Sequence, residues 1–343
     1  MNETHPLRAD AAFAAGSAVP WIGRRRFRAV RARDLARMSL YDLAIAPFQD
    51  FVFMRRALAA VFALALGSAP LGVLLTLRRM SLAGDALAHA VLPGVAVAFI
   101  VFGLSLPALS IGGFLAGVLV VLAAVWVSRY TDLKEDASFA AGYLVALAAG
   151  VLLISSHGTQ IDLLHILFGN ILGVDRVGLV LVTGVSSVTL VGLALFYRAF
   201  LLESFDPAYL RSITGGGGLF QFLFLMLVVA NLVAAFQVMG TLMAVGLMML
   251  PAVSARLWHA MLPAQLLNAA LQALLAGYAG LLLSYHFDQP SGPVIVMCSG
   301  ALYALSLLLA PQGWRGRRKA HLHAEAVAQG HLHHDHEHHS HLH

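Results

Sequence analysis

A carboxylate and an imidazole stand four residues apart at the start of a long apolar run. They are Asp85 and His89, within residues 79–94. Positions i and i+4 share one face of a helix, so the two side chains are expected to lie together. With a helical rise of about 1.5 Å per residue, His89 lies roughly 15 Å from Arg79, about half of a hydrocarbon core of about 30 Å. Ionisable groups at that depth usually mark an ion or substrate path. The alternative is a buried polar pair that only fixes helix packing.

The composition places this pair in a membrane protein. Hydrophobic residues make up 59% of the 343 residues and charged residues only 11%, and the mean hydropathy is +0.80. Soluble domains have about 25% charged residues. Recurring apolar runs of helical length favour a helix bundle over a β-barrel. We therefore expect an all-α, polytopic membrane protein with polar extensions at both ends.

The charged and sulfur-containing residues exclude several classes of protein. Arginines at helix ends explain the net charge of +5, so the charge does not indicate nucleic acid binding. Cys298 is the only cysteine, which excludes intrachain disulfides and cysteine-cluster metal sites. A transition metal would then be held by imidazole and carboxylate. The only lysines, Lys134 and Lys319, do not follow glycine, so the chain lacks a P-loop. We expect a transport subunit and not an enzyme, with ATP hydrolysis in a separate subunit and no permanently bound cofactor.

Nine apolar segments are the candidate spans. They lie roughly at 57–77, 86–104, 108–128, 137–155, 177–197, 219–237, 240–257, 264–285 and 293–310. The boundary between the sixth and seventh is the weakest, so eight spans are an alternative. Pro93, Pro251 and Pro293 lie within or at the ends of spans, where proline kinks a helix or exposes backbone carbonyls.

Basic residues predict the orientation of the chain. One side collects Arg78, Arg79, Arg129, Lys134, Arg198, Arg211, Arg256, Arg315, Arg317, Arg318 and Lys319, whereas the other collects only Arg176. By the positive-inside rule, the first side and the C-terminal tail are cytoplasmic. The Ala- and Arg-rich arm at residues 1–50 then starts outside, against the same rule. Either the arm is not made, or it folds back, or one span is miscounted. It is an amphipathic helix on anionic lipid or an upstream extension that adds little.

Two loops and the tail carry further candidate residues. On the outer side, His157, Asp162, His165, His286 and Asp288 could line an entrance, or they are ordinary loop and interfacial residues. The run that ends at residue 173 is too short to span and indicates a re-entrant or interfacial helix. On the cytoplasmic side, residues 205–214 include Phe205, Asp206, Pro207 and Arg211. Asp206 can cap a short helix with Pro207 at its first position, and four glycines at 215–218 end it. Such a helix suits docking of another protein; a plain solvated loop is the alternative.

The tail at residues 312–343 is rich in histidine and is expected to be disordered. Its densest part contains His331, His333, His334, His336, His338, His339, His341 and His343. Neutral imidazoles in such a tract can chelate Zn²⁺, Ni²⁺ or Cu²⁺. Asp, Glu, Ser and Leu interrupt the tract, which is unlike a purification tag. The alternative is a tract without a metal role.

Residues 77–94 resemble the most specific signature of the membrane permease subunits of bacterial ABC importers for zinc, manganese and iron(II). Further matches lie at residues 165–173, 204–207, 238–242, 250–252 and 290–292. The resemblance covers residues 47–311, and we take 51–311 as the membrane domain. It implies a homodimer in the bacterial inner membrane, with a translocation path between or near the subunits. It also implies an ATPase subunit on the cytoplasmic face and an extracytoplasmic solute-binding protein.

The resemblance also assigns roles to residues. Asp85 and His89 match the aspartate and histidine that bind the ion in the path, and residues 205–214 match the helix that docks the ATPase. The four glycines at 215–218 depart from the family pattern, and the arm and the tail lie outside the shared region. The tail favours Zn²⁺ as the transported ion, with Mn²⁺ or Fe²⁺ as alternatives. Two other hypotheses remain: an ATP-independent metal channel or carrier, and an ABC permease for a chelated metal or cofactor.

Overall fold

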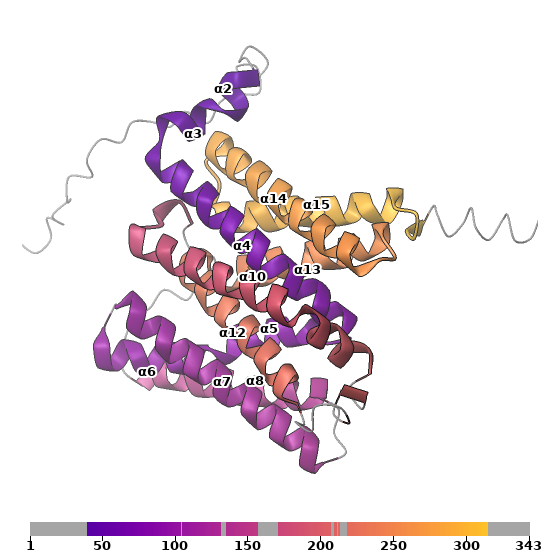
Figure 1. Cartoon of the computed structure of the whole chain (residues 1–343). Coiled ribbons are helices and arrows are strands. Elements are labelled where there is room, and N and C mark those ends of the chain that lie inside the picture. Colours follow the sequence, from indigo (N-terminus) through magenta and orange to yellow (C-terminus); the bar gives the residue numbers. More distant parts are fainter. Residues whose placement is uncertain are drawn as a thin grey trace, which may run out of the picture.

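The structure, a computed structural model, describes residues 40–103, 105–131, 135–156, 171–206, 209, 210, 212 and 218–314. The arm before residue 40 and the His-rich tail from residue 315 lie outside these residues. The helices, drawn in Figure 1, are α2 (Leu40–Ala44), α3 (Ala46–Asp50), α4 (Val52–Leu77), α5 (Ser81–Ala90), α6 (Leu92–Phe102), α7 (Leu106–Tyr130), α8 (Glu135–Ser156), the 3₁₀ turn η1 (Ile171–Gly173), α10 (Arg176–Phe205), α12 (Leu219–Met239), α13 (Thr241–Trp258), α14 (Leu262–Phe287) and α15 (Ser291–Leu309).

Nine helical spans in the described part of the chain are long and apolar enough to cross a membrane, which confirms the expected all-α bundle. The second span runs over Ser81–Phe102 and combines α5 and α6. It begins five residues before the predicted 86, so Asp85 lies within the helix and not just before it. The weak boundary between the sixth and seventh segments is a real one. Gly240 separates α12 from α13 with φ of 80°, a left-handed conformation that glycine adopts without strain.

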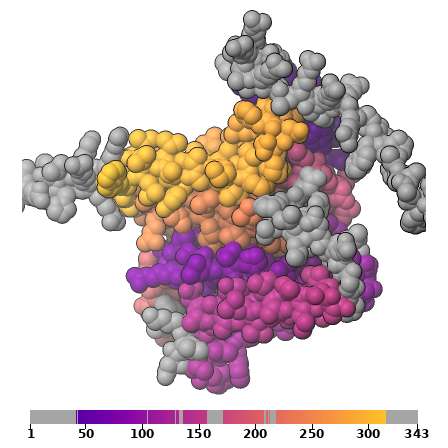
Figure 2. Space-filling view, turned by 180° about the vertical axis from the view of Figure 1, so that it is seen from behind, coloured from indigo at the N-terminus to yellow at the C-terminus, as the bar shows by residue number. Residues whose placement is uncertain are grey.

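Helix α4 is the centre of the bundle. It packs against α10, α12, α13 and α14, and Figure 1 shows α10 running alongside it. Its second half, residues 67–76, is buried on nearly every side, as is typical of a helix enclosed by protein. Its first half keeps one exposed stripe, which includes Val52, Phe62 and Leu66. The opposite face of the molecule, in Figure 2, is formed by the orange and yellow C-terminal helices above and by purple and magenta residues of α5 to α8 below. The membrane domain is therefore a layer of spans around one central helix.

Glycines allow neighbouring spans to touch backbone to backbone. A Cβ on Gly94 would lie 2.0 Å from the carbonyl oxygen of Gly112, and a Cβ on Gly72 would lie 2.1 Å from that of Met248. These contacts join α6 to α7 and α4 to α13. Small residues at such crossings give van der Waals contact where lipid supplies no hydrophobic driving force. The second span, which carries Asp85 and His89, is thus fixed by a glycine contact just after His89.

Candidate functional site

Asp85 and His89 lie side by side on α5, as their spacing predicted. The His89 Nε2 atom is 3.7 Å from the Asp85 Oδ1 atom, and the two side chains are 27% and 60% exposed. Leu82, one turn earlier on the same face, is 69% exposed. The opposite face of α5 is buried, through Ala83 and Leu87 among others. The pair is therefore not a buried polar pair in the described chain, because its side chains lie at the surface of the chain.

The backbone breaks directly after His89. Helix α5 ends at Ala90, and α6 begins at Leu92 with Pro93 in its first turn. Proline has no N–H, so Pro93 cannot donate to the carbonyl four residues earlier, which is that of His89. The N–H of Val91 donates to this carbonyl instead. The prediction that Pro93 interrupts a span is thus correct, and the interruption fixes the helix end that carries His89.

Of the five predicted entrance residues, the structure describes two. His286 is 6% exposed, near the end of α14, and its Nδ1 lies 2.8 Å from the carbonyl oxygen of Leu282. Its Nε2 is buried without a hydrogen-bond partner among the described residues. Asp288 is exposed, with φ of 53°, and caps the end of α14. The other three, His157, Asp162 and His165, lie outside the described residues.

The structure assembles no larger ligand set around these residues. In the described part of the chain, no group of three or more His, Cys, Asp or Glu side chains could hold a metal ion. The described part of the chain therefore brings together only two such side chains here, those of Asp85 and His89. A closed structural zinc site normally has four protein ligands. A site with fewer ligands suits an ion that must be released.

The loop that follows α10 begins with the predicted cap. The Oδ1 atom of Asp206 accepts a hydrogen bond of 2.9 Å from the N–H of Tyr209. Phe205 and Tyr209 are 67% and 53% exposed, whereas Leu210 is buried. Pro207 and Arg211 are outside the part of the chain that the structure describes. The described residues of the loop thus present aromatic side chains outward and anchor it by one leucine.

Sequence reasoning placed Arg78 in the signature and among the basic residues, but it missed the contacts that Arg78 makes with α10 and α12. Arg78, at the end of α4, donates from Nε to Ser204 Oγ at 3.0 Å and from Nη2 to the carbonyl of Phe200 at 3.4 Å. Its guanidinium also lies 4.2 Å from the ring centroid of Phe224 on α12. We call these contacts the Arg78 clamp. It joins the ends of α4 and α10 to α12. Arg78 lies three residues before the start of α5, and Ser204 lies one residue before the loop at 205–214.

Comparisons with known proteins agree with this architecture. The manganese transport system membrane protein MntC of Halalkalibacterium halodurans is 34% identical over 282 residues, which are 80% of this chain and 95% of that protein. A probable iron transport system membrane protein of Haemophilus influenzae is 31% identical over 273 residues, 80% and 95% of the two chains. The solved structure of PsaBC from Streptococcus pneumoniae in complex with Fab contains a chain that is 30% identical; the match covers 80% of this chain and 97% of that one, with a TM-score of 0.70.

A match between the chain and a model of a protein family confirms the resemblance that the signature indicated. The model of the ABC 3 transport family matches residues 50–310, which include every described span. The relatives are membrane components of manganese and iron transport systems, and the chain is a multi-pass transport subunit. It belongs to the ABC 3 transport family.

Proposed function

We propose that this chain is the permease subunit of an ATP-driven importer that moves a divalent transition-metal ion into the cytoplasm. The observation that carries the proposal is the Asp85–His89 pair on the exposed face of α5. Asp85 is the fifth residue of the second span, Ser81–Phe102, and ionisable side chains within membrane spans almost always face the bundle interior, a water-filled cavity or a polar partner. A 60% exposed Asp85 side chain is therefore compatible with a water-filled path or a protein partner, but not with lipid.

A second copy of the chain is the partner we propose for this face. The two subunits of a homodimer are usually related by a two-fold axis, which brings the same surface patch of both subunits together. An axis beside α5 would place two Asp85–His89 pairs around one path. The ion would then be held by carboxylate and imidazole, which suit divalent transition metals. A nucleotide-binding ATPase would dock at residues 205–214, and a solute-binding protein would deliver the ion from outside.

The transported ion is the point on which two observations differ. The relatives are named for manganese and iron, and one Asp with one His fits either. The ten histidines between residues 321 and 343 favour zinc, because imidazole suits Zn²⁺ better than Mn²⁺. We propose that the transported ion is Zn²⁺, Mn²⁺ or Fe²⁺. The histidine-rich tail is the feature that would favour Zn²⁺.

Removing the tail is expected to lower the share of zinc in metal uptake. A chain that ends at Trp314 keeps the hydrogen bond from the N–H of Gln312 to the carbonyl of Leu257, so the bundle stays intact. Uptake by vesicles from an equimolar mixture of Zn²⁺, Mn²⁺ and Fe²⁺ under reducing conditions, counted by mass spectrometry, measures the change. A full-length variant in which the eight histidines between residues 331 and 343 are changed to serine tests the same side chains without shortening the chain. An unchanged zinc share in both chains would show that the tail has no part in selectivity.

The Arg78 clamp is expected to couple ATPase docking at residues 205–214 to the position of α5. Hydrogen bonds to charged groups contribute about 1.5–3 kcal/mol, and lysine cannot reproduce the forked geometry of arginine. In Arg78→Lys, we therefore expect more ATP hydrolysed per ion transported by the assembled complex. Ser204→Ala, which removes one contact of the clamp, should show a smaller change in the same direction.

The control for the clamp is its neighbour. Arg79 is exposed, so Arg79→Lys makes the same chemical change one residue away. It should leave the ratio of ATP to ions near that of the parent. If Arg78→Lys and Arg79→Lys give equal ratios, the clamp is only a packing contact.

A further inference from the structure

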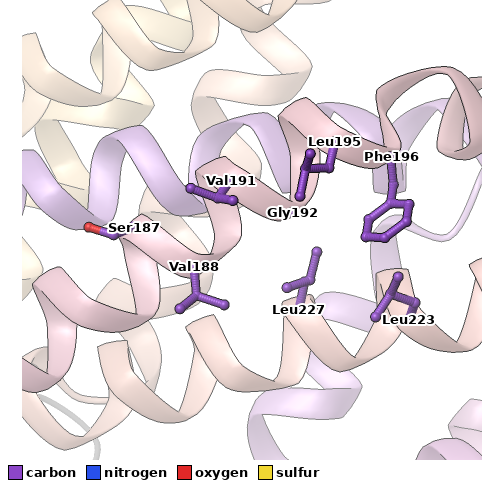
Figure 3. Close-up of a pocket in the computed structure, with 8 residues that line it drawn as sticks. All are labelled: Ser187, Val188, Val191, Gly192, Leu195, Phe196, Leu223 and Leu227. Carbon is purple, nitrogen blue, oxygen red and sulfur yellow. The ribbon is translucent and has the colours of Figure 1, made fainter.

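An apolar slot lies between α10 and α12 on the outer surface of the bundle. Figure 3 shows Val188, Val191 and Leu195 on α10 and Leu223 and Leu227 on α12, which line it together. The hollow has a volume of about 430 Å³. The one hydroxyl at its end, that of Ser187, donates its hydrogen to the carbonyl of Thr183, and the other lining side chains are apolar. The slot therefore offers only hydrocarbon surface to an occupant.

The floor of the slot is shaped by a glycine. A Cβ on Gly192 would lie 3.1 Å from Cδ1 of Leu227, so a larger residue there would narrow the slot. A second hollow of about 310 Å³ shares Val188 and Leu227 and continues the groove toward the start of α10. The lining from 187 to 196 covers about 14 Å of helix. This length is close to one leaflet, half of a hydrocarbon core of about 30 Å.

The positively charged side chain of Arg198 lies beyond the end of the slot, on α10. Val191, Leu195 and Arg198 follow the spacing i, i+4 and i+7, which keeps them on one face of α10. Val191 and Leu195 are 58% and 72% exposed, and Arg198 is exposed as well. No described side chain forms an ion pair or hydrogen bond with Arg198. Helix α10 is 30 residues long, so Arg198 lies where the helix leaves the hydrocarbon core.

We propose that the slot and Arg198 form an inner-leaflet binding site for an anionic phospholipid. One acyl chain would lie in the slot, and the guanidinium of Arg198 would bind the phosphate, a pairing that arginine favours through its planar, forked donors. The charge pattern of the loops puts this end of α10 in the cytoplasmic leaflet. The proposal depends on the position of α10 in the membrane and not on the ion that the protein transports.

The position of the slot argues against a second copy of the chain as its occupant. Helix α10 packs against α4 and α12, whereas α5, which carries the Asp85–His89 pair, packs most extensively against α8. In Figure 1 α10 crosses the front of the bundle, and α5 belongs to the face seen from behind in Figure 2. A two-fold axis beside α5 leaves α10 on the outside, facing lipid.

Lipid retention tests the site. The full chain with its ATPase is extracted from vesicles of equal parts phosphatidylglycerol and phosphatidylcholine, and the lipids that stay bound are counted by native mass spectrometry. The parent should retain more phosphatidylglycerol than phosphatidylcholine. Arg198→Gln should lose this preference, and Val188→Trp, which fills the slot, should lose retained lipid of both kinds.

Two matched variants and a cross-link complete the experiment. Arg256→Gln removes another exposed arginine, and Leu267→Trp enlarges a side chain on α14 that is 64% exposed, as Val188 is. Both should retain lipid as the parent does. Equal preference in Arg198→Gln and Arg256→Gln would overturn the proposal. So would a disulfide-linked dimer of Val191→Cys in a Cys298→Ser background, because it would put a second copy at the slot.

Discussion

Replacing Asp85 by asparagine or His89 by alanine is expected to abolish metal uptake while leaving the fold intact. Even residues that only support metal ligands change affinity or activity by about 10–100-fold when they are replaced, so loss of a ligand should cost at least as much. The fold should tolerate both changes, because the two side chains are 60% and 27% exposed on α5. The measurement pairs ATP-dependent uptake in vesicles with the thermal midpoint of unfolding in detergent.

The control for this pair lies on the same face of the helix. Ser81 is exposed and stands one turn before Asp85, so Ser81→Ala tests whether any change on this face impairs transport. It should transport metal at the parental rate. Parental transport by Asp85→Asn or His89→Ala, at equal amounts of protein, would remove both residues from the ion path.

Substituting alanine for Gly94 is expected to destabilise the bundle strongly. The added methyl group would lie 2.0 Å from the carbonyl oxygen of Gly112, a backbone atom that cannot rotate away. Overpacking of this kind costs about 1–3 kcal/mol and occasionally more. Because α6 follows α5 after one residue, a displaced α6 should also move His89 and reduce transport. Thermal unfolding in detergent measures the first effect, and ATP-dependent uptake measures the second.

A glycine-to-alanine change at a position with room for the methyl group should instead stabilise the protein. Gly184 lies within α10, and a Cβ there meets nothing within 4 Å. Alanine is more favourable than glycine in a helix by about 0.5–1 kcal/mol, so Gly184→Ala should raise the thermal midpoint slightly. Equal midpoints for Gly94→Ala and Gly184→Ala would show that the α6–α7 contact does not constrain the second span.

Local patterns explain what could be predicted from the sequence. The spans follow from apolar runs, and the approach of His89 to Asp85 follows from a separation of one helical turn. The cap at Asp206 is equally local, because its partner is the N–H three residues later. In each case the interacting groups are close in the chain, so propensity and period are enough to place them.

Contacts between distant residues could not be predicted in this way. Ser204 lies 126 residues from Arg78, and no single-sequence pattern relates them. The burial of His286, one of the candidate entrance residues, likewise depends on packing at the end of α14. The slot beside Val191 needs two helices to be placed side by side. The sequence signal that was available at Arg78 was its position within the signature at residues 77–94.

The most direct test of the proposed function is a count of ions and ATP in one experiment. Vesicles that contain the permease, its ATPase and its solute-binding protein are supplied with Zn²⁺, Mn²⁺ and Fe²⁺, and the metals inside are counted against ATP hydrolysed. We predict accumulation of one of these ions that requires ATP and disappears when Asp85 and His89 are replaced together. Accumulation that proceeds without ATP, or that persists in the double variant, would contradict the account.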